Sequence, residues 1–291
     1  MTAKTVSDEV EQSSMSLIEH LTELRNRIIW SLLAFVVAMI LCFFVWEPIY
    51  DFLTIPLCDA LNARGQECEL VFLSVQEGFF LAFQISMIAG LIVSFPVISY
   101  QMWRFVAPGL YRQEKAAFLP FLLASPAMFF LGAFFAYYIV TPMAFTFFLG
   151  FQDPAALAAE GEVVSDASAA MVFQGSAQSY LSLTMSFIVA FGLCFQLPVL
   201  LTLMGRAGIV SSGALVRTRK YAVVAILILA AVATPPDMMS QIILFAAVYP
   251  LYEVSILLMR RNERKVEARM RAEGTLAEGE SLYGDAPETK A

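Results

Sequence analysis

The side chains of this sequence that could do chemistry gather beside its apolar segments, and the clearest group is the stretch HLTELRNR at 20–27. It combines the only histidine, His20, with the carboxylate of Glu23 and the guanidinium of Arg27. On a helix, Glu23 and Arg27 form an i,i+4 pair that contributes about 0.2–0.5 kcal/mol. A second carboxylate, Glu114, also stands among basic residues. Charge patterning alone favours a helix-stabilising pair for Glu23 and a solvated loop charge for Glu114.

Catalysis needs a nucleophile, a base and a group that orients the base, and this sequence offers no such set. His20 lies outside the apolar segments, and none of those segments contains a histidine or a pair of aspartates. No spacing typical of metal ligands is present, and nothing resembles a nucleotide-binding loop. We therefore expect no enzymatic activity, no cofactor, no metal ion and no nucleic-acid partner.

The composition predicts the class of protein. The chain has 291 residues, of which 59% are hydrophobic and 15% charged, with a mean hydropathy of +0.72. In soluble domains about 45–50% of the residues are hydrophobic and about 25% are charged. A helix needs about 20 apolar residues to cross a bilayer. Six runs qualify, although the fifth reaches only about 20 Å at 1.5 Å per residue; they are 28–47, 78–102, 118–149, 180–204, 221–233 and 238–259. The predicted fold is an all-α, polytopic membrane protein with six transmembrane helices.

Basic residues near span ends predict the orientation, because such residues stay on the cytoplasmic side. With the amino terminus inside, the three outer loops contain a single basic residue, Arg64. Both termini are then cytoplasmic. We expect a flexible amino terminus at 1–15, a membrane domain at 16–261 and a disordered tail at 262–291, since the tail has little apolar content.

Prolines fall inside or near the ends of most runs: Pro96, Pro120, Pro126, Pro142, Pro198 and Pro250. Each one frees a backbone carbonyl and bends its helix. Two interpretations stand side by side, ordinary membrane-helix prolines and a curved, concave bundle.

Two of the four cysteines, Cys58 and Cys68, fall in the first outer loop, between the first two runs. An oxidising outer compartment permits a disulfide between them. Two free thiols are the equally favoured alternative.

Four motifs in order, HLTELRNR, FVAPGLYRQEK, FQLPV and TPPDMMSQ, make the sequence similar to the TatC family over about 16–261. TatC is the multi-spanning subunit of the twin-arginine protein translocase. The resemblance implies a multi-pass protein of the bacterial cytoplasmic (inner) membrane. It also implies a receptor for signal peptides with two consecutive arginines, which initiates export of folded proteins using the proton-motive force. The implied partners are TatB, TatA, membrane lipid and further copies in an oligomeric receptor complex.

The resemblance also assigns residues. In the family, the glutamates at the positions of Glu23 and Glu114 bind the arginine pair, and a guanidinium can engage a carboxylate with two parallel hydrogen bonds, which lysine cannot copy. The same binding region takes in Arg25, Phe105, Pro108 and Tyr111. Partner-docking or structural roles fall to Pro56, Phe79, Gln196, Asp237, Gln241 and Glu253.

Plainer roles remain open for several of these residues. Pro108 is compatible with a simple turn, Phe105 and Phe79 with core packing, and Asp237 with capping of a helix. Gln196 stands where relatives often have a glutamate at mid-membrane depth, so it either contacts TatA as a neutral group or bonds to a neighbouring helix.

Glu253, the one carboxylate within the sixth run, is expected to be neutral and buried, paired, or reached by water. Two functions of other classes stay as alternatives to the receptor, namely a secondary transporter of a small solute and a membrane scaffold.

Overall fold

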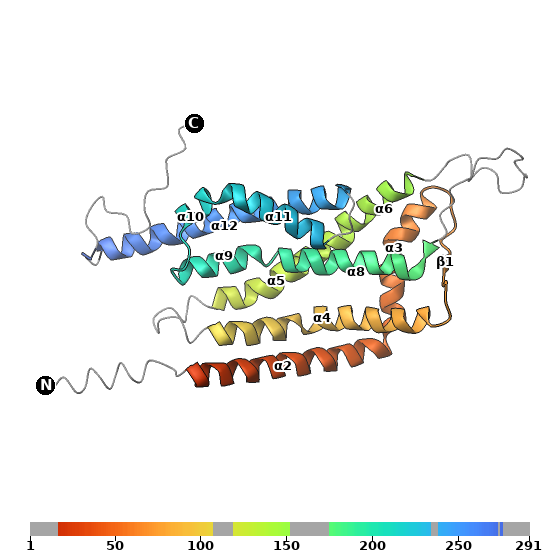
Figure 1. The fold of residues 1–291 in the computed structure, drawn as a ribbon, viewed down its shortest axis with the longest axis horizontal. Coiled ribbons are helices and arrows are strands. Elements are labelled where there is room, and N and C mark those ends of the chain that lie inside the picture. Colours follow the sequence, from red (N-terminus) through yellow and green to blue (C-terminus); the bar gives the residue numbers. More distant parts are fainter. Residues whose placement is uncertain (1–16, 107–118, 152–174, 234–237, 273, 276–291) are drawn as a thin grey trace, which may run out of the picture.

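The computed structural model describes residues 17–106, 119–151, 175–233, 238–272 and 274–275, and they are almost entirely helical (Figure 1). The only strands in these ranges are two short ones, which pair in parallel. The elements in chain order are α2 (Leu17–Phe44), α3 (Trp46–Asn62), β1 (Leu70–Val71), α4 (Glu77–Val106), α5 (Leu119–Phe135), the π-helix η3 (Ala136–Val140), α6 (Thr141–Leu149), β2 (Gly175–Ser176), α8 (Ala177–Cys194), α9 (Leu197–Arg206), α10 (Ser212–Arg217), α11 (Arg219–Ala233) and α12 (Met238–Ala272).

The predicted apolar runs all fall on helices, which confirms the all-α class. Five helical segments of the described chain are long and apolar enough to cross a membrane: Leu21–Phe44, Glu77–Phe105, Phe121–Leu149, Ala177–Arg206 and Met238–Ala272. The remaining run is α11, whose 15 residues reach only about 22 Å at 1.5 Å each. That is less than the bilayer core of about 30 Å, so α11 is a span only where neighbouring helices or a thinned bilayer accommodate it.

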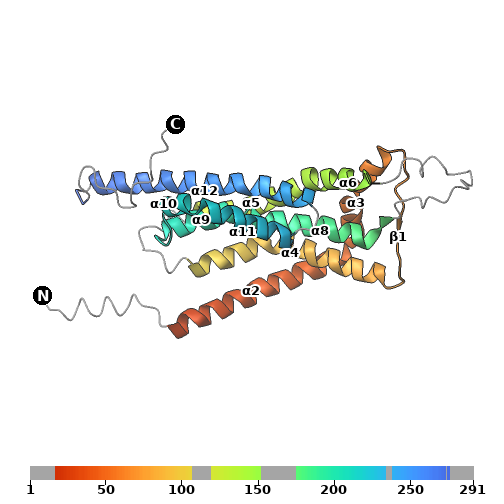
Figure 2. The same cartoon turned by 45° about the horizontal axis from the view of Figure 1, so that its top comes forward.

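The long helices pack side by side, with α2 at one edge and α12 at the other (Figures 1 and 2). In the main contacts α2 packs on α4, α4 on α5, α5 on α8, α9 on α12 and α11 on α12. α2 and α12 lie at opposite edges of the molecule in both views, while α3 and α6 lie together at the end far from the first turn of α2 and the last turn of α12. The side chains of α2 and those of α12 therefore belong to different parts of the fold.

Prolines account for the irregularities of two spans. The third span changes into a π-helix turn at Ala136–Val140 immediately before Pro142, where Thr141 Oγ1 donates to the Ala136 carbonyl at 2.9 Å. The fourth span breaks between Cys194 and Leu197, just before Pro198, which cannot continue an ordinary helical ladder. The hydroxyl of Thr141 thus adds a second hydrogen bond to a carbonyl that already accepts from the Thr141 backbone nitrogen.

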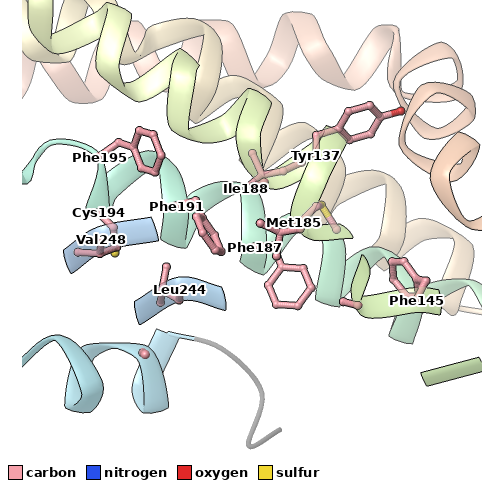
Figure 3. Close-up of a cluster of buried hydrophobic side chains, with 14 of the residues drawn as sticks. Tyr137, Phe145, Met185, Phe187, Ile188, Phe191, Cys194, Phe195, Leu244 and Val248 are labelled. Carbon is pink, nitrogen blue, oxygen red and sulfur yellow. The ribbon is translucent and has the colours of Figure 1, made fainter. Parts of the chain in front are cut away.

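The core is aromatic and lies where α8 meets α5, η3 and α12 (Figure 3). Phe187 and Phe191 of α8 are fully buried, with Leu244 and Val248 of α12 on one side. Phe129 of α5 is also fully buried and stacks on Phe95 of α4. These contacts fix the middle of the molecule and leave α2 at its margin.

The loop before α4 and the start of α8 are held together by a residue that the sequence analysis did not single out. Glu77, only 4% exposed, accepts hydrogen bonds from the backbone nitrogens of Leu73 at 2.6 Å and Ser74 at 3.2 Å, and from Ser176 and Gln178 at 3.3 and 3.4 Å. One carboxylate thus joins the loop before α4 to the start of α8. Of the two predicted states of the cysteines nearby, the structure has the Cys58–Cys68 disulfide.

The predicted disordered tail is wrong for 262–272, because α12 continues as a helix to Ala272. Glu263 anchors this extension: it is 8% exposed and accepts hydrogen bonds from both the backbone nitrogen, at 2.7 Å, and the hydroxyl of Ser212. Tyr252, also on α12, donates to the Leu215 carbonyl at 2.8 Å. The segment is poor in apolar residues, and its order comes instead from contacts with α10 that are distant in the sequence.

Candidate functional site

The pair predicted within HLTELRNR is present on α2. Arg27 Nη2 donates to Glu23 Oε1 at 2.8 Å, which confirms the i,i+4 contact. Arg27 Nη1 also donates to Gln101 Oε1 on α4, at 3.1 Å. Arg27 therefore connects the two helices, and the sequence analysis missed Gln101 because nothing in its surroundings distinguishes it from an ordinary interfacial glutamine.

The Glu23–Arg27 pair leaves hydrogen-bonding capacity unused. The Glu23 and Arg27 side chains are 20% and 19% exposed, but Glu23 Oε2 and Arg27 Nε are buried and have no hydrogen-bond partner among the described residues. A guanidinium and a carboxylate can form two parallel hydrogen bonds, whereas this pair forms one. A second guanidinium that approached Glu23 with two of its N–H groups would therefore form hydrogen bonds that the Glu23–Arg27 pair lacks.

An apolar groove of about 410 Å³ lies beside this pair, between α2 and α4. Leu24, Ile28 and Phe35 line it from α2, and Met102 and Phe105 from α4. Phe105 is half-buried, so its predicted place in the binding region and its contribution to packing are compatible. Arg25, on the same helix, is exposed. A carboxylate at the edge of an apolar groove suits a ligand in which a basic group precedes an apolar stretch.

Four predicted positions lie outside the described residues: Glu114, Pro108, Tyr111 and Asp237. Their roles remain predictions.

Two residues predicted near the outer side differ in their surroundings. Pro56 is buried inside α3. Phe79 is 63% exposed and contacts Phe80 edge to face, so core packing, the plainer of its two predicted roles, does not describe it.

Gln196 bonds to a neighbouring helix, which was one of its two predicted roles. Its Oε1 accepts from Ser125 Oγ at 2.8 Å, and its Nε2 donates to the Ser125 carbonyl at 2.8 Å. The amide thereby joins the break between α8 and α9 to the middle of α5. A glutamate could make the second of these bonds only by being protonated, since an ionised carboxylate has no donor.

Glu253 is paired, one of the three states predicted for it. Arg219, the first residue of α11, donates to Glu253 Oε2 at 2.7 Å, and the Tyr249 hydroxyl donates to Oε1 at 3.1 Å. Gln241, the other polar residue predicted on this helix, is half-buried nearer the beginning of α12. The pair holds the short α11 against α12.

Comparison with known proteins decides what this arrangement belongs to. The family model of the Sec-independent protein translocase protein (TatC) matches residues 19–246. The chain belongs to the TatC family. The TatC protein of Magnetococcus marinus is 42% identical over 88% of this chain and 88% of its own length. That of Aquifex aeolicus is 36% identical over 86% of this chain and 97% of its own.

This chain also has the fold of a TatC protein whose structure is solved. A crystal structure of the twin-arginine translocase receptor TatC superposes with a TM-score of 0.70 and 36% identity, over 83% of this chain and 98% of the other. This TatC-family chain is a multi-pass membrane protein and a component of the Tat translocase, a role in protein transport that implies a complex with other Tat subunits.

Proposed function

We propose that this chain is the receptor that recognises twin-arginine signal peptides and initiates the export of folded proteins across the bacterial inner membrane. Both termini are cytoplasmic in this proposal, and the proton-motive force supplies the energy. The single observation that carries it is the buried Oε2 of Glu23 beside the α2–α4 groove, which has no hydrogen-bond partner among the residues that the structure describes. A relative of the same fold is described as the twin-arginine translocase receptor, which supports the assignment.

Recognition proceeds by exchange of arginines at Glu23. In the resting protein Arg27 occupies Oε1 with one hydrogen bond and is itself retained by Gln101. An arginine of the signal peptide can use both carboxylate oxygens at once, because its guanidinium is a planar fork, while lysine is a point charge. Displaced from Glu23, Arg27 keeps its bond to Gln101. Arg-Arg is therefore preferred over Lys-Lys despite equal charge.

The second arginine is assigned to Glu114, by family resemblance. Two charge-assisted hydrogen-bonded contacts at about 1.5–3 kcal/mol each supply about 3–6 kcal/mol. Micromolar affinity requires about 8.2 kcal/mol. The remainder comes from the apolar stretch of the signal peptide, which lies in the groove formed by residues such as Leu24, Ile28 and Met102.

Assembly with other subunits uses the opposite edge. We assign the docking of TatB and TatA to the surface of α11 and α12, because α11 is too short to fill the bilayer and the Glu253–Arg219 pair is partly exposed there. An oligomeric receptor complex and contacts with membrane lipid complete the proposed surroundings.

Photocrosslinking of a twin-arginine signal peptide to the full chain in membranes tests the receptor function. We expect Glu23→Gln to reduce crosslinking about tenfold or more, the loss that follows from one charge-assisted contact. Replacement of Arg-Arg by Lys-Lys in the peptide should give a similar loss with the unaltered protein.

Glu267→Gln is the matched control, since Glu267 lies on α12 at the opposite edge of the fold, where it contacts Arg271 at 3.9 Å. It should leave crosslinking unchanged. Equal crosslinking in Glu23→Gln and the unaltered protein, with both folded, contradicts the proposal.

A further inference from the structure

A second hollow, separate from the α2–α4 groove, lies where α5, α9 and α12 meet, and its volume is about 400 Å³. Apolar side chains form most of its wall, including Phe121 and Met128 of α5, Val199 of α9 and Leu258 of α12. Leu258 is 46% exposed, so the hollow is open toward the outside of the bundle. An apolar opening on the outer surface of a membrane protein faces lipid chains.

One end of this hollow is basic. Arg206, Arg261 and Lys265 all line it. Arg206 is the last residue of α9, and its guanidinium lies over the ring of Phe121 at 4.6 Å from the centroid. Arg261 and Lys265 are exposed and one helical turn apart on α12, so they project on the same side. The hollow thus combines an apolar wall with three positive charges at its rim.

An acidic residue, Glu263, also lines the hollow. Both of its oxygens accept hydrogen bonds from Ser212, one from the backbone nitrogen and one from the hydroxyl. Its charge is therefore bound to the beginning of α10 and only partly offsets the three cations. Counted over the described residues that line the hollow, the rim remains net positive.

The basic rim lies at the level of a membrane surface. From Met238 to Arg261, α12 rises about 34 Å at 1.5 Å per residue. The bilayer core is about 30 Å thick, so a helix that starts at one boundary reaches the other near Arg261. Arg206 ends the fourth span at the same level. Lipid phosphates are found at this depth.

We propose that this hollow binds one anionic glycerophospholipid of the adjoining leaflet, with its phosphate at Arg206, Arg261 and Lys265 and an acyl chain along Val199 and Leu258. Basic pockets between membrane helices on the cytoplasmic side recognise phosphate headgroups in this way. The lipid fills the space between α5 and α12, which both pack on α9 but have few contacts with each other. It acts away from Glu23, so it is independent of the proposed receptor function.

The test is native mass spectrometry of the full chain in detergent, titrated in parallel with phosphatidylglycerol, phosphatidylcholine and glycerol phosphate. We expect a single saturable phosphatidylglycerol site, bound at least tenfold more tightly than phosphatidylcholine. Glycerol phosphate carries the charge without acyl chains and should neither bind nor compete at the same concentrations.

Paired variants locate the site. Arg261→Gln with Lys265→Gln should weaken phosphatidylglycerol binding about thirtyfold, since each basic side chain near the membrane surface contributes about fivefold. The matched control, Arg264→Gln with Arg269→Gln, removes the same charge from positions of α12 outside the hollow and should change binding by less than twofold. The thermal unfolding midpoint of each variant verifies folding.

Three results would overturn the proposal. Equal binding of phosphatidylglycerol and phosphatidylcholine removes the role of the charges. Equal losses in the two double variants indicate general attraction to the basic helix rather than a site. Competition by glycerol phosphate as effective as that of the lipid indicates an adventitious anion only.

Discussion

The α2–α4 edge and the α5–α8–α12 centre differ in how fully their side chains are buried and hydrogen-bonded. In the apolar part of α2 only 11% of residues are buried, against 61% in the span formed by α8 and α9. The α2–α4 edge and the surface of α11 and α12 each have an ion pair, and the two carboxylates differ in how many of their oxygens accept hydrogen bonds. Glu23 uses one carboxylate oxygen, while both oxygens of Glu253 accept hydrogen bonds. Of these two carboxylates, the one with an oxygen that accepts no hydrogen bond from the described residues lies at the edge that we assign to recognition.

The largest effect should come from adding a methyl group at glycines of the two regions. A Cβ at Gly132 of α5 would lie 2.5 Å from the Phe191 carbonyl oxygen, and one at Gly90 of α4 would lie 2.7 Å from the backbone of Met39 on α2. Gly132→Ala should cost about 3 kcal/mol, because the surrounding core cannot move. Gly90→Ala should cost about 1 kcal/mol, because α2 packs mainly on α4 and can shift outward.

Thermal unfolding of both variants in the same detergent measures this difference. A loss at Gly90→Ala as large as that at Gly132→Ala would show that α2 is held as firmly as the centre. The comparison between the regions would then fail.

The second effect concerns the carboxyl-terminal part of α12, where Glu263 is buried and hydrogen-bonded. Glu263→Ala removes two hydrogen bonds and leaves the Ser212 nitrogen buried without a partner, so we expect a loss of about 2 kcal/mol. Arg264→Ala, at an exposed position on the same helix, should change stability by less than about 0.5 kcal/mol. Unfolding midpoints and limited proteolysis after Met259 report the change, and an unaltered proteolysis rate in Glu263→Ala contradicts the anchoring role.

A smaller loss of stability is expected when the hydrogen bonds between Gln196 and Ser125 are removed. Gln196→Leu removes both bonds to Ser125 and should cost about 1 kcal/mol, in the range of hydrogen bonds between membrane helices. Ser125→Ala removes only the hydroxyl donor and should cost less. Stabilisation by Gln196→Leu would show that the amide is kept for a partner rather than for packing.

Much of the fold was predictable because the membrane imposes it. Length and apolarity alone predict the helices, and the i,i+4 spacing predicts the Glu23–Arg27 contact. Several of the contacts that were missed join residues far apart in the chain. Gln101 contacts Arg27 from another helix, and Glu263 of α12 contacts Ser212 of α10, and neither contact leaves a local signal. The same reason explains the error at 262–272, where low apolar content indicated disorder.

The candidate site was predicted in part. The resemblance to TatC proposed Glu23, but only the structure relates it to a groove that Phe105 lines and to an oxygen left unpaired. The distance within each ion pair does not show whether its carboxylate has an unused oxygen, since Glu23–Arg27 and Glu253–Arg219 are both contacts of 2.7–2.8 Å. The difference lies in what else each carboxylate accepts.

The most direct test of the central claim, that Arg27 occupies Glu23 until an arginine of the signal peptide replaces it, is the affinity of one fluorescent twin-arginine peptide for three proteins. Arg27→Gln removes the competitor and should bind the peptide about two- to fivefold more tightly than the unaltered chain, as expected for loss of an exposed to half-buried ion pair. Glu23→Gln should bind about tenfold more weakly. Weaker binding in both variants would mean that Arg27 supports the site rather than competing for it, and would contradict the exchange.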